Sequence, residues 1–370
     1  MKQSFAQILD ASAEELRKKL FRKVPSWESA DIRIPGSLCV EQCSSEETGL
    51  YKATLADRIA GKDGLIVDLT GGLGVDSWAF AQSGRPVIYN EMNTVLADAA
   101  RSNFAELGIC NINVISKTIM LHNIGTILNT NNKASLIYLD PARRNQQGRK
   151  VFLIEDCQPD ILGLKDEIFK KTDNILVKLS PMADITMVAE RLGECVREIH
   201  VVEAGRECKE ILVWMRKGWS GGYSITASGK DGSFSFRKDD EAAAEVSLPS
   251  DISDFNGRFL YEPGPALMKA APFKLICQRF GMKKAGHFSH LYISSSTGRK
   301  IVDVMPFNNM NVKVLGKSFP KCEVTARNIR MSSDDLRRKM GVSSGGDVHI
   351  FATTCDYTDG RSEKVFIVTS

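Results

Sequence analysis

The sequence predicts an α/β fold with a mostly parallel sheet, and three observations support this prediction. Between residues 61 and 218, short runs rich in β-branched and aromatic residues alternate with segments of helical periodicity. A glycine-rich turn follows the first run, as expected where a buried strand leads into a helix. The last two runs are separated only by the short loop 204–208, which leaves no room for a helix. We therefore expect an antiparallel hairpin to close the sheet.

The elements are expected in the following places. The strands of this region are predicted at 65–69, 86–90, 112–116, 135–139, 174–179, 198–203 and 209–215. Helices are predicted between most of them, for example at 76–82 and 93–107. Upstream, residues 4–23 are expected to form a helix with Ser12 as its N-cap. Downstream, the glycine-rich residues 218–249 indicate a linker or a peripheral hairpin.

The remainder of the chain is predicted to be an α+β region. Strand-like runs lie at 288–294, 300–304, 311–315, 348–353 and 364–369, and helices are expected near 266–280 and 333–340. We divide the chain into an N-terminal helical extension (1–60), the α/β domain (61–220), a linker with a small unit (221–300) and a C-terminal domain (301–370).

Composition excludes several classes of protein. With 43% hydrophobic and 25% charged residues, the 370-residue chain is neither disordered, nor collagen-like, nor a disulfide scaffold. A net charge of +4 means that nucleic-acid binding would depend on local basic patches. The nine cysteines include no Cys-x-x-Cys pair, and no apolar run approaches the roughly 18 residues of a membrane span. We expect a cytoplasmic protein with no metal site and no membrane association.

The strongest motif is the glycine turn at residues 67–76, VDLTGGLGVD. Its spacing, Gly72-x-Gly74-x-x-Ser77, lacks the third glycine of a dinucleotide-binding fingerprint. The Asp68 carboxylate at the strand end would also repel a pyrophosphate. It suits a cationic ligand without phosphate, such as S-adenosylmethionine.

Glu91 supports this interpretation, because it ends the second predicted strand, where an acid can accept hydrogen bonds from both ribose hydroxyls. The alternative is that Asp68 and Glu91 merely cap loops. The other candidates for cofactor contacts follow the first three strands, namely Thr70, Gly71, Gly72, Gly74, Asp76, Met92, Ser116 and Lys117.

Residues 61–218 resemble class I S-adenosylmethionine-dependent methyltransferases. The resemblance implies a Rossmann-like, seven-stranded sheet and S-adenosylmethionine as the cofactor. Ser116 and Lys117 stand where many members carry an acid that contacts the adenine amino group. Backbone groups at these two residues could supply the adenine contacts instead.

The motif at residues 139–144, LDPARR, marks the expected reaction centre. Reactants meet at strand carboxyl ends in this fold, so Asp140 should face the transferred methyl group and Pro141 should fix the turn. In-line methyl transfer needs an oriented nucleophile and an acceptor for its proton. The alternative is that residues 139–144 form a βα turn whose role is purely structural. Leu179 stands where the RNA uridine C5-methyltransferases carry a nucleophilic cysteine, which disfavours a covalent intermediate.

Asp140, Lys178 and Glu210 occupy positions similar to three members of the Lys-Asp-Lys-Glu tetrad of ribose 2′-O-methyltransferases. In that chemistry a lysine with a lowered pKa deprotonates the hydroxyl. Lys52 could be the fourth member, although no motif fixes it. Structural pairing of Lys178 with Asp140 is the alternative.

The flanking segments extend the resemblance. Together with VDLTGGLGVD, LDPARR and LVKLSP, the segment EQCSSEET at 41–48 resembles a bacterial methyltransferase family with a ferredoxin-like unit and a C-terminal THUMP-like domain. This resemblance implies that Gln42 and Ser45 fold over the cofactor pocket. Cys43 invites assignment as a nucleophile, but no histidine lies nearby in the sequence, which favours a packed cysteine.

Basic residues point to the substrate. Arg143 and Arg144 follow the reaction motif and could bind phosphates or form a solvated loop. Residues 313–339 contain eight basic and three acidic residues, a local charge of +5 that could neutralise several phosphates. The substrate candidates in that segment are Lys313, Arg327 and Arg330.

True THUMP domains bind structured RNA, so the resemblance suggests an RNA substrate, either tRNA or rRNA. We therefore expect an RNA methyltransferase that transfers the methyl group directly. The alternatives are a protein or small-molecule methyltransferase, and an RNA-binding module with a vestigial cofactor site. The sequence gives no sign of DNA specificity and does not specify an oligomeric state.

Overall fold

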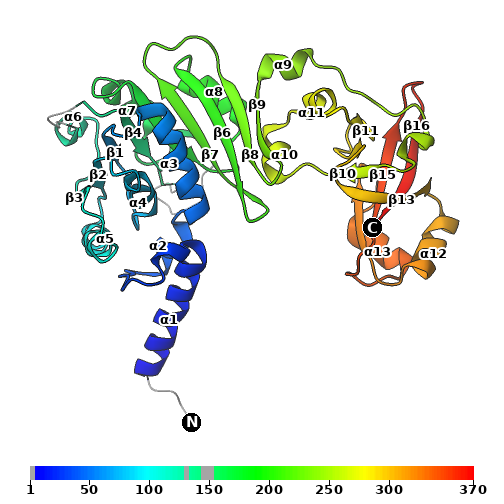
Figure 1. The fold of residues 1–370 in the computed structure, drawn as a ribbon, viewed down its shortest axis with the longest axis horizontal. Helices are drawn as coiled ribbons and strands as arrows, with labels where there is room; N and C mark the ends of the chain where they lie inside the picture. The colour runs from blue at the N-terminus through cyan, green and yellow to red at the C-terminus, as the bar shows by residue number, and fades with distance from the viewer. Residues whose placement is uncertain (1–4, 129–132, 143–153) are drawn as a thin grey trace. The chain divides into compact units, whose positions relative to one another are not determined.

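The computed structural model describes residues 5–128, 133–142 and 154–370 (Figure 1). The chain divides into two compact units, Met1–Ser235 and Phe236–Ser370, and each is described by itself. No helix within the described residues is long and apolar enough to cross a membrane.

A nine-stranded sheet forms the centre of the first unit. Its strands are β1 (Ile66–Asp68), β2 (Val87–Asn90), β3 (Ile112–Ile115), β4 (Leu136–Leu139), β5 (Asn174–Leu179), β6 (Val196–Ala204), β7 (Glu207–Arg216), β8 (Ser224–Gly229) and β9 (Gly232–Arg237). Their order is β3-β2-β1-β4-β5-β7-β6-β8-β9. Strands β1 to β5 run parallel, whereas β7 runs antiparallel to both β5 and β6. The seven expected strands and the closing hairpin are confirmed.

Of the two interpretations of residues 218–249, the peripheral hairpin is confirmed and the linker is wrong, because two strands of this segment extend the edge of the sheet. Strand β8 pairs in parallel with β6, for example Ile199 with Ile225, and β9 lies beyond β8. Residues 224–237 therefore form a hairpin at the edge of the sheet. Its alternating buried residues, such as Phe234 and Phe236, explain this placement.

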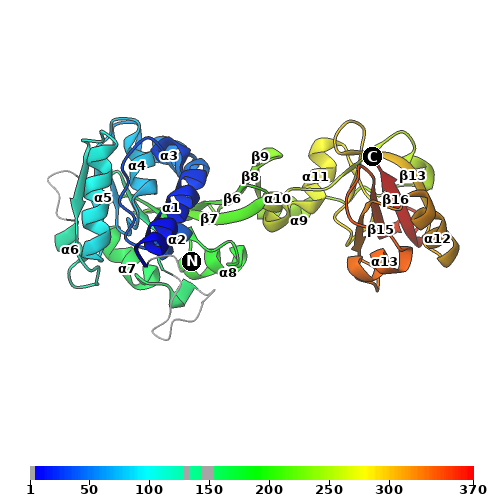
Figure 2. The ribbon, with the colours of Figure 1, turned by 90° about the horizontal axis from the view of Figure 1, so that it is seen from below.

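Helices cover both faces of this sheet (Figure 2). The helices of the first unit are α1 (Phe5–Lys23), α2 (Ser37–Gln42), α3 (Glu46–Ala60), α4 (Val75–Ala81), α5 (Thr94–Glu106), α6 (Ile124–Ile127), α7 (Ile161–Ile168) and α8 (Ile185–Leu192), with short 3-10 turns η1 (Pro25–Trp27) and η2 (Ile154–Asp156). Leu55 of α3 and Phe80 of α4 pack on one face against Leu136 and Leu176.

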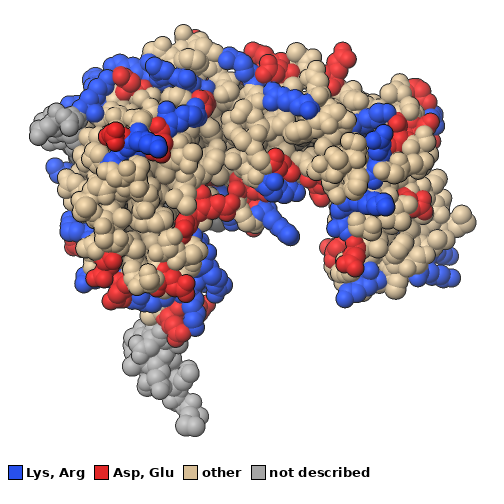
Figure 3. Space-filling view, in the orientation of Figure 1, with Lys and Arg blue, Asp and Glu red and all other residues tan. Residues whose placement is uncertain are grey.

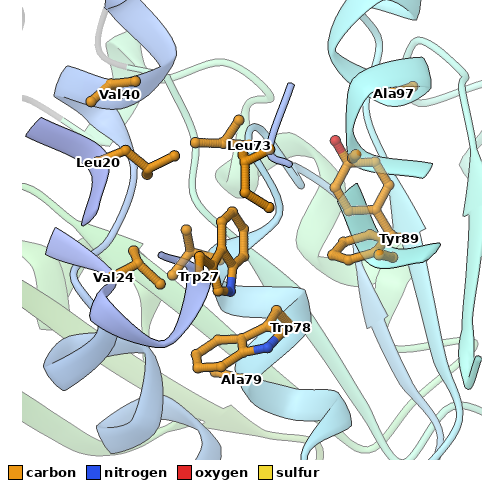
Figure 4. Close-up of a cluster of buried hydrophobic side chains, with 13 residues drawn as sticks. Leu20, Val24, Trp27, Val40, Leu73, Trp78, Ala79, Tyr89 and Ala97 are labelled. Carbon is orange, nitrogen blue, oxygen red and sulfur yellow. The ribbon is translucent and has the colours of Figure 1, made fainter. Parts of the chain in front are cut away.

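The N-terminal extension packs beside the glycine turn (Figure 4). Leu20, Val24 and Trp27 are fully buried with Leu73 of the turn. The rings of Trp27 and Trp78 meet edge to face, with centroids 5.9 Å apart. The extension therefore belongs to the core that supports the site. Ser12 is not an N-cap: α1 begins seven residues earlier, and an exposed serine is tolerated inside a helix.

The second unit is built on one seven-stranded sheet. Its strands are β10 (Phe259–Tyr261), β11 (Lys283–Lys284), β12 (Tyr292–Ser294), β13 (Arg299–Pro306), β14 (Glu323–Arg327), β15 (His349–Asp356) and β16 (Ser362–Thr369), in the order β11-β12-β10-β13-β16-β15-β14. Its helices are α9 (Lys238–Ala243), α10 (Pro265–Ala270), α11 (Phe273–Phe280), α12 (Asn309–Ser318), α13 (Ser333–Met340) and the 3-10 turn η3 (Ile252–Phe255).

Three expectations for this unit were wrong. Residues 311–315 lie in helix α12 because Asn308 caps its start and Val312 and Leu315 face the core. The helix expected over 266–280 breaks at Ala271, which has a φ of 60°, and at Pro272, which lacks an N–H. In the run 288–294, only Tyr292–Ser294 forms a strand. The sequence prediction also missed β10, β11 and β14.

Candidate functional site

Three carboxylates lie at the carboxyl ends of neighbouring parallel strands. Asp68 ends β1, Glu91 follows β2, and Asp140 follows β4. Because β1 pairs with both β2 and β4, the three residues share one edge of the sheet. An edge with three acids suits a cationic ligand and opposes a pyrophosphate.

Asp68 is fully buried and organises the glycine turn. Its Oδ1 accepts a hydrogen bond from the Thr70 N–H at 3.0 Å, and its Oδ2 accepts one from the Ser77 hydroxyl at 2.6 Å. Burial raises the pKa of Asp68 to about 7, against the opposing effect of these hydrogen bonds. Asp68 therefore gains or loses its proton near neutral pH.

Cofactor binding should depend on pH through Asp68. A cationic ligand favours the carboxylate, so affinity should rise about tenfold between pH 6 and 8 as a group with a pKa near 7 ionises. We expect calorimetry with S-adenosylmethionine to show this rise and the accompanying proton release. The Asp68→Asn variant should lack this rise in affinity between pH 6 and 8, even if it still binds the cofactor. An identical pH slope in the two proteins would contradict the prediction.

Glu91 bridges the glycine turn and helix α5. Its two carboxylate oxygens accept hydrogen bonds from the N–H groups of Gly72 and Asn93, each at 2.9 Å. Each oxygen keeps a lone pair for a further donor, so the residue can still serve a ribose. Met92 beside it is 69% exposed.

Ser116 and Lys117 follow β3 and are tied to the same loops. The Ser116 hydroxyl donates to the Glu91 carbonyl at 2.8 Å, and the Lys117 N–H donates to Asn90 Oδ1 at 3.0 Å. Asn90, which is buried, also donates to the Leu69 carbonyl at 3.1 Å. These bonds align the loops after β1, β2 and β3.

The three glycines of the turn have different roles. A Cβ on Gly71 would lie 2.0 Å from the Tyr89 ring, and one on Gly74 would lie 2.6 Å from the Phe104 ring. These two glycines are required by packing. Gly72 has a φ of 54°, and nothing lies within 4 Å of its Cβ position, so the turn presents its backbone to open space there. The turn therefore fits a ligand that approaches at Gly72.

Asp140 joins the glycine turn to the reaction motif. Its N–H donates to the Thr70 hydroxyl at 2.6 Å, and its Oδ2 pairs with Lys178 Nζ at 2.5 Å. The Asp140 side chain is 31% exposed, whereas that of Lys178 is 8% exposed. Of this pair, Asp140 is thus the member with more access to solvent. Pro141 follows it directly, and Ala142 exchanges two backbone hydrogen bonds with Gln158.

A buried charge cluster lies beside this pair. Lys52 of α3 is fully buried and contacts Glu210 Oε1 of β7 at 2.6 Å and Asp76 Oδ1 of α4 at 3.3 Å. Asp76 Oδ2 accepts hydrogen bonds from the Tyr138 hydroxyl at 2.8 Å and the Ser44 hydroxyl at 3.0 Å. Sequence reasoning missed Ser44 and Tyr138 as site residues, because their bonds to Asp76 join segments that are far apart in the sequence.

The cluster sets the charge state of Lys178. Burial alone would lower the pKa of Lys178, but Asp140, Glu210 and Asp76 together raise it above its ordinary value. Lys178 is therefore held as an ammonium ion in the free protein. This state opposes the action of Lys178 as a base.

Comparison with known proteins assigns the chain to a family. Family models for a ferredoxin-like domain and a THUMP domain-like region match residues 259–299 and 299–370. A crystal structure from Porphyromonas gingivalis W83, named provisionally as a methyltransferase, is 32% identical and has a TM-score of 0.80. The match covers 96% of this chain and 88% of that chain. The chain belongs to this methyltransferase family.

Other structures match over a smaller part of the chain. An rRNA methylase from Streptococcus thermophilus is 13% identical, with a TM-score of 0.34, over 45% of this chain and 94% of that chain. TrmN from Thermus thermophilus is 14% identical, with a TM-score of 0.35, over 45% of this chain and 48% of that chain. No curated protein matches the chain.

The methyltransferase has a Rossmann-like domain followed by ferredoxin-like and THUMP-like domains, as the sequence resemblance implied. As a member of this family, it is an enzyme that transfers methyl groups. Its sheet edge would fit S-adenosylmethionine, because Asp68, Glu91 and the open backbone at Gly72 suit a ligand with ammonium, sulfonium and ribose groups.

The segment before α3 lies next to the site of the methyltransferase. Ser45 caps α3, since its hydroxyl accepts a hydrogen bond from the Thr48 N–H at 3.3 Å, and Gln42 is exposed at the end of α2. Lys23 donates to the Val40 carbonyl at 2.8 Å and so fixes the end of α2. Burial raises the pKa of the Cys43 thiol to about 11, which argues against a nucleophilic role.

The structure describes only some of the proposed substrate residues of the methyltransferase. Arg143 and Arg144 lie outside the described residues. In the second unit, Lys313 and Arg330 are exposed, whereas Arg327 is half-buried and paired with Glu262. Within the described ranges, no group of three or more metal-ligating side chains occurs.

Proposed function

We propose that this methyltransferase acts on RNA and transfers the methyl group directly to the acceptor, with Asp140 at the reaction centre. The observation that carries the proposal is the placement of Asp140, held between the Thr70 hydroxyl and the Lys178 ammonium beside the cofactor turn. The site contains no nucleophilic cysteine in β5, where Leu179 lies next to Lys178. A covalent intermediate is therefore not part of the proposal.

The cofactor would be held by the loops after the first three strands of the parallel sheet. Bound S-adenosylmethionine supplies the methyl group. In the proposal, Asp68 and the turn around Gly72 hold its amino acid portion, Glu91 accepts hydrogen bonds from its ribose, and Met92, Ser116 and Lys117 border its adenine. Asp76, at the end of the turn, is fixed by hydrogen bonds from the Tyr138 and Ser44 hydroxyls.

At the reaction centre, this chain would orient the acceptor and hold its proton. The Asp140 carboxylate has an oxygen that is not paired with Lys178, and this oxygen can accept a hydrogen bond from an N–H or O–H group of the acceptor. Lys178 fixes the rotamer of Asp140. Such positioning places the acceptor in line with the methyl group.

An RNA substrate is supported by charge and domain content. Residues 313–339 carry a net charge of +5, and this segment lies in the THUMP domain-like region. Figure 3 shows lysine and arginine side chains on the visible surface of the chain. Binding through phosphates would weaken steeply as salt increases.

Labelling with tritiated cofactor tests this proposal. We expect total RNA from cells lacking the gene to be labelled by the wild-type enzyme and to remain unlabelled with Asp140→Ala. Digestion of the RNA would then identify the methylated nucleoside. Label in protein or in a small molecule, with unlabelled RNA, would favour the alternative substrates. If calorimetry detects no binding of S-adenosylmethionine, the alternative of a vestigial cofactor site would be favoured.

A second candidate acceptor is the ribose 2′-hydroxyl. The structure brings together Lys52, Asp140, Lys178 and Glu210, in the pairs Lys52–Glu210 at 2.6 Å and Lys178–Asp140 at 2.5 Å. These are the residue types of the 2′-O-methyltransferase tetrad. The raised pKa of Lys178 opposes its role as a base in the free protein. Alkaline hydrolysis separates the candidates, because a 2′-O-methylated nucleotide leaves a resistant dinucleotide and a base-methylated one does not.

A further inference from the structure

The loop between β11 and β12 carries an unusually exposed aromatic side chain. Phe288 is 75% exposed, more than any other large apolar side chain among the described residues. Its neighbour His287 is also exposed, and the two ring centroids are 6.5 Å apart. Isolated exposed side chains need no explanation by themselves. The hydrogen bonds that fix this loop, however, are unusual for a surface loop and need an explanation.

The backbone on both sides of Phe288 is firmly fixed. The His287 N–H donates to Asp356 Oδ2 at 2.7 Å, and the His287 carbonyl accepts from Lys284 Nζ at 2.5 Å. Lys284 is only 5% exposed, and its ammonium also lies 5.3 Å from the centroid of the Phe273 ring. The Ser289 hydroxyl, also buried, donates to the Gly286 carbonyl at 3.1 Å.

The base of the loop is equally constrained. The Ala285 N–H donates to the Leu291 carbonyl at 2.8 Å, and the Asp356 N–H donates to the Ala285 carbonyl at 3.0 Å. His290 adopts a φ of 50°, and its ring stacks on Phe273 with centroids 3.9 Å apart. A non-glycine residue in this backbone region is strained and persists only where its surroundings fix it. The loop is thus a rigid support that presents Phe288 to solvent.

The composition of the segment that carries this loop indicates the kind of partner. The ferredoxin-like segment 259–299 contains one acidic residue, Glu262, which is paired with Arg327. Its six basic residues give it a net charge of +5, and they are Lys269, Lys274, Arg279, Lys283, Lys284 and Arg299. Of these six, Lys283 is paired with Asp254 and Lys284 is buried. An exposed, rigid aromatic ring on a domain of net positive charge is an arrangement by which proteins hold unpaired nucleotides, since the ring stacks on a base and cations attract the phosphates.

We propose that Phe288 is a stacking platform for an unpaired base of the RNA substrate. This inference rests on the proposed function and narrows it to RNA with a single-stranded segment. It assigns to the ferredoxin-like domain a contact separate from the basic residues 313–339. Stacking depends on the ring, whereas the phosphate contacts depend on charge, so the two contributions can be measured separately.

The test uses the full chain and a fluorescein-labelled, single-stranded 12-nucleotide RNA of mixed sequence, followed by anisotropy. Phe288→Ala should weaken binding about tenfold with an unchanged salt slope, because no charge is removed. Phe288→Trp should restore binding, and Phe288→Leu should not. Phe280→Ala removes another exposed phenylalanine of the same unit and should leave binding unchanged. Annealing the RNA into a duplex should abolish the difference between wild type and Phe288→Ala.

Several outcomes would overturn the inference. If Phe288→Ala binds the RNA with wild-type affinity, the ring does not contribute to binding. If Phe288→Leu binds with wild-type affinity, the contact is apolar rather than aromatic, as expected for a protein partner. An equal loss on duplex RNA would exclude base stacking. If RNA is labelled by the enzyme in any of these cases, the proposed function stands and only the platform fails. If the wild type neither labels nor binds RNA, both fail.

Discussion

Asp140→Ala should abolish methyl transfer while largely preserving cofactor binding. We expect turnover to fall by about 10²–10⁴-fold, which is the usual contribution of a group that holds or takes a proton in the transition state. The proposed cofactor contacts of Asp68 and Glu91 do not pass through the Asp140 side chain, since Thr70 bonds to its backbone N–H. Single-turnover rates and calorimetry on the same preparation separate the two effects.

A matched control for this change is Asp173→Asn. Asp173 lies in the same unit, just before β5, and pairs with Lys133 at 2.7 Å, but both side chains are more than half exposed. This variant should keep full turnover. If Asp140→Ala lost cofactor affinity as strongly as turnover, Asp140 would be a cofactor or structural residue and the proposed reaction centre would be wrong.

Lys52→Met should strongly destabilise the first unit. The substitution leaves Glu210 and Asp76 buried without their shared cation, and breaking a buried ion pair in this way costs about 3–5 kcal/mol. Denaturant unfolding should show the loss as a lower midpoint. The double variant Lys52→Met/Glu210→Gln should recover part of it, because the glutamine removes one of the two uncompensated charges.

The comparison for this prediction is Lys133→Met, which breaks the exposed pair with Asp173 and should cost no more than about 1 kcal/mol. Equal losses in Lys52→Met and Lys133→Met would show that the buried cluster contributes no special stability. Recovery of stability without recovery of turnover in the double variant would show that the cluster also positions Asp140 through Lys178.

Much of the fold follows from local sequence patterns. The strands of the α/β region were predicted because parallel strands buried on both faces read as short, continuous apolar runs. The closing hairpin followed from loop length alone. Residues 311–315 were misassigned because a short apolar run fits a strand or a helix equally well, and only the cap at Asn308 and the core contact of Leu315 decide between them.

The chemistry-bearing residues of the sheet edge were also accessible from sequence. Asp68, Glu91 and Asp140 follow predicted strands, and the carboxyl ends of parallel strands meet at one edge. The roles of Gly71 and Gly74 were not accessible, because the rings of Tyr89 and Phe104 that exclude a side chain at these positions come from other parts of the chain.

The sequence by itself determined the net charge of +4, the order of the elements and the acids that follow the strands. Only the tertiary structure decided how the charges combine. Lys52 carries no motif, yet it lies fully buried between Glu210 and Asp76, which are 134 residues apart in the chain. The physical reason is that a buried charge is stable only where opposite charges surround it, and such an arrangement depends on distances that exist only in the folded chain.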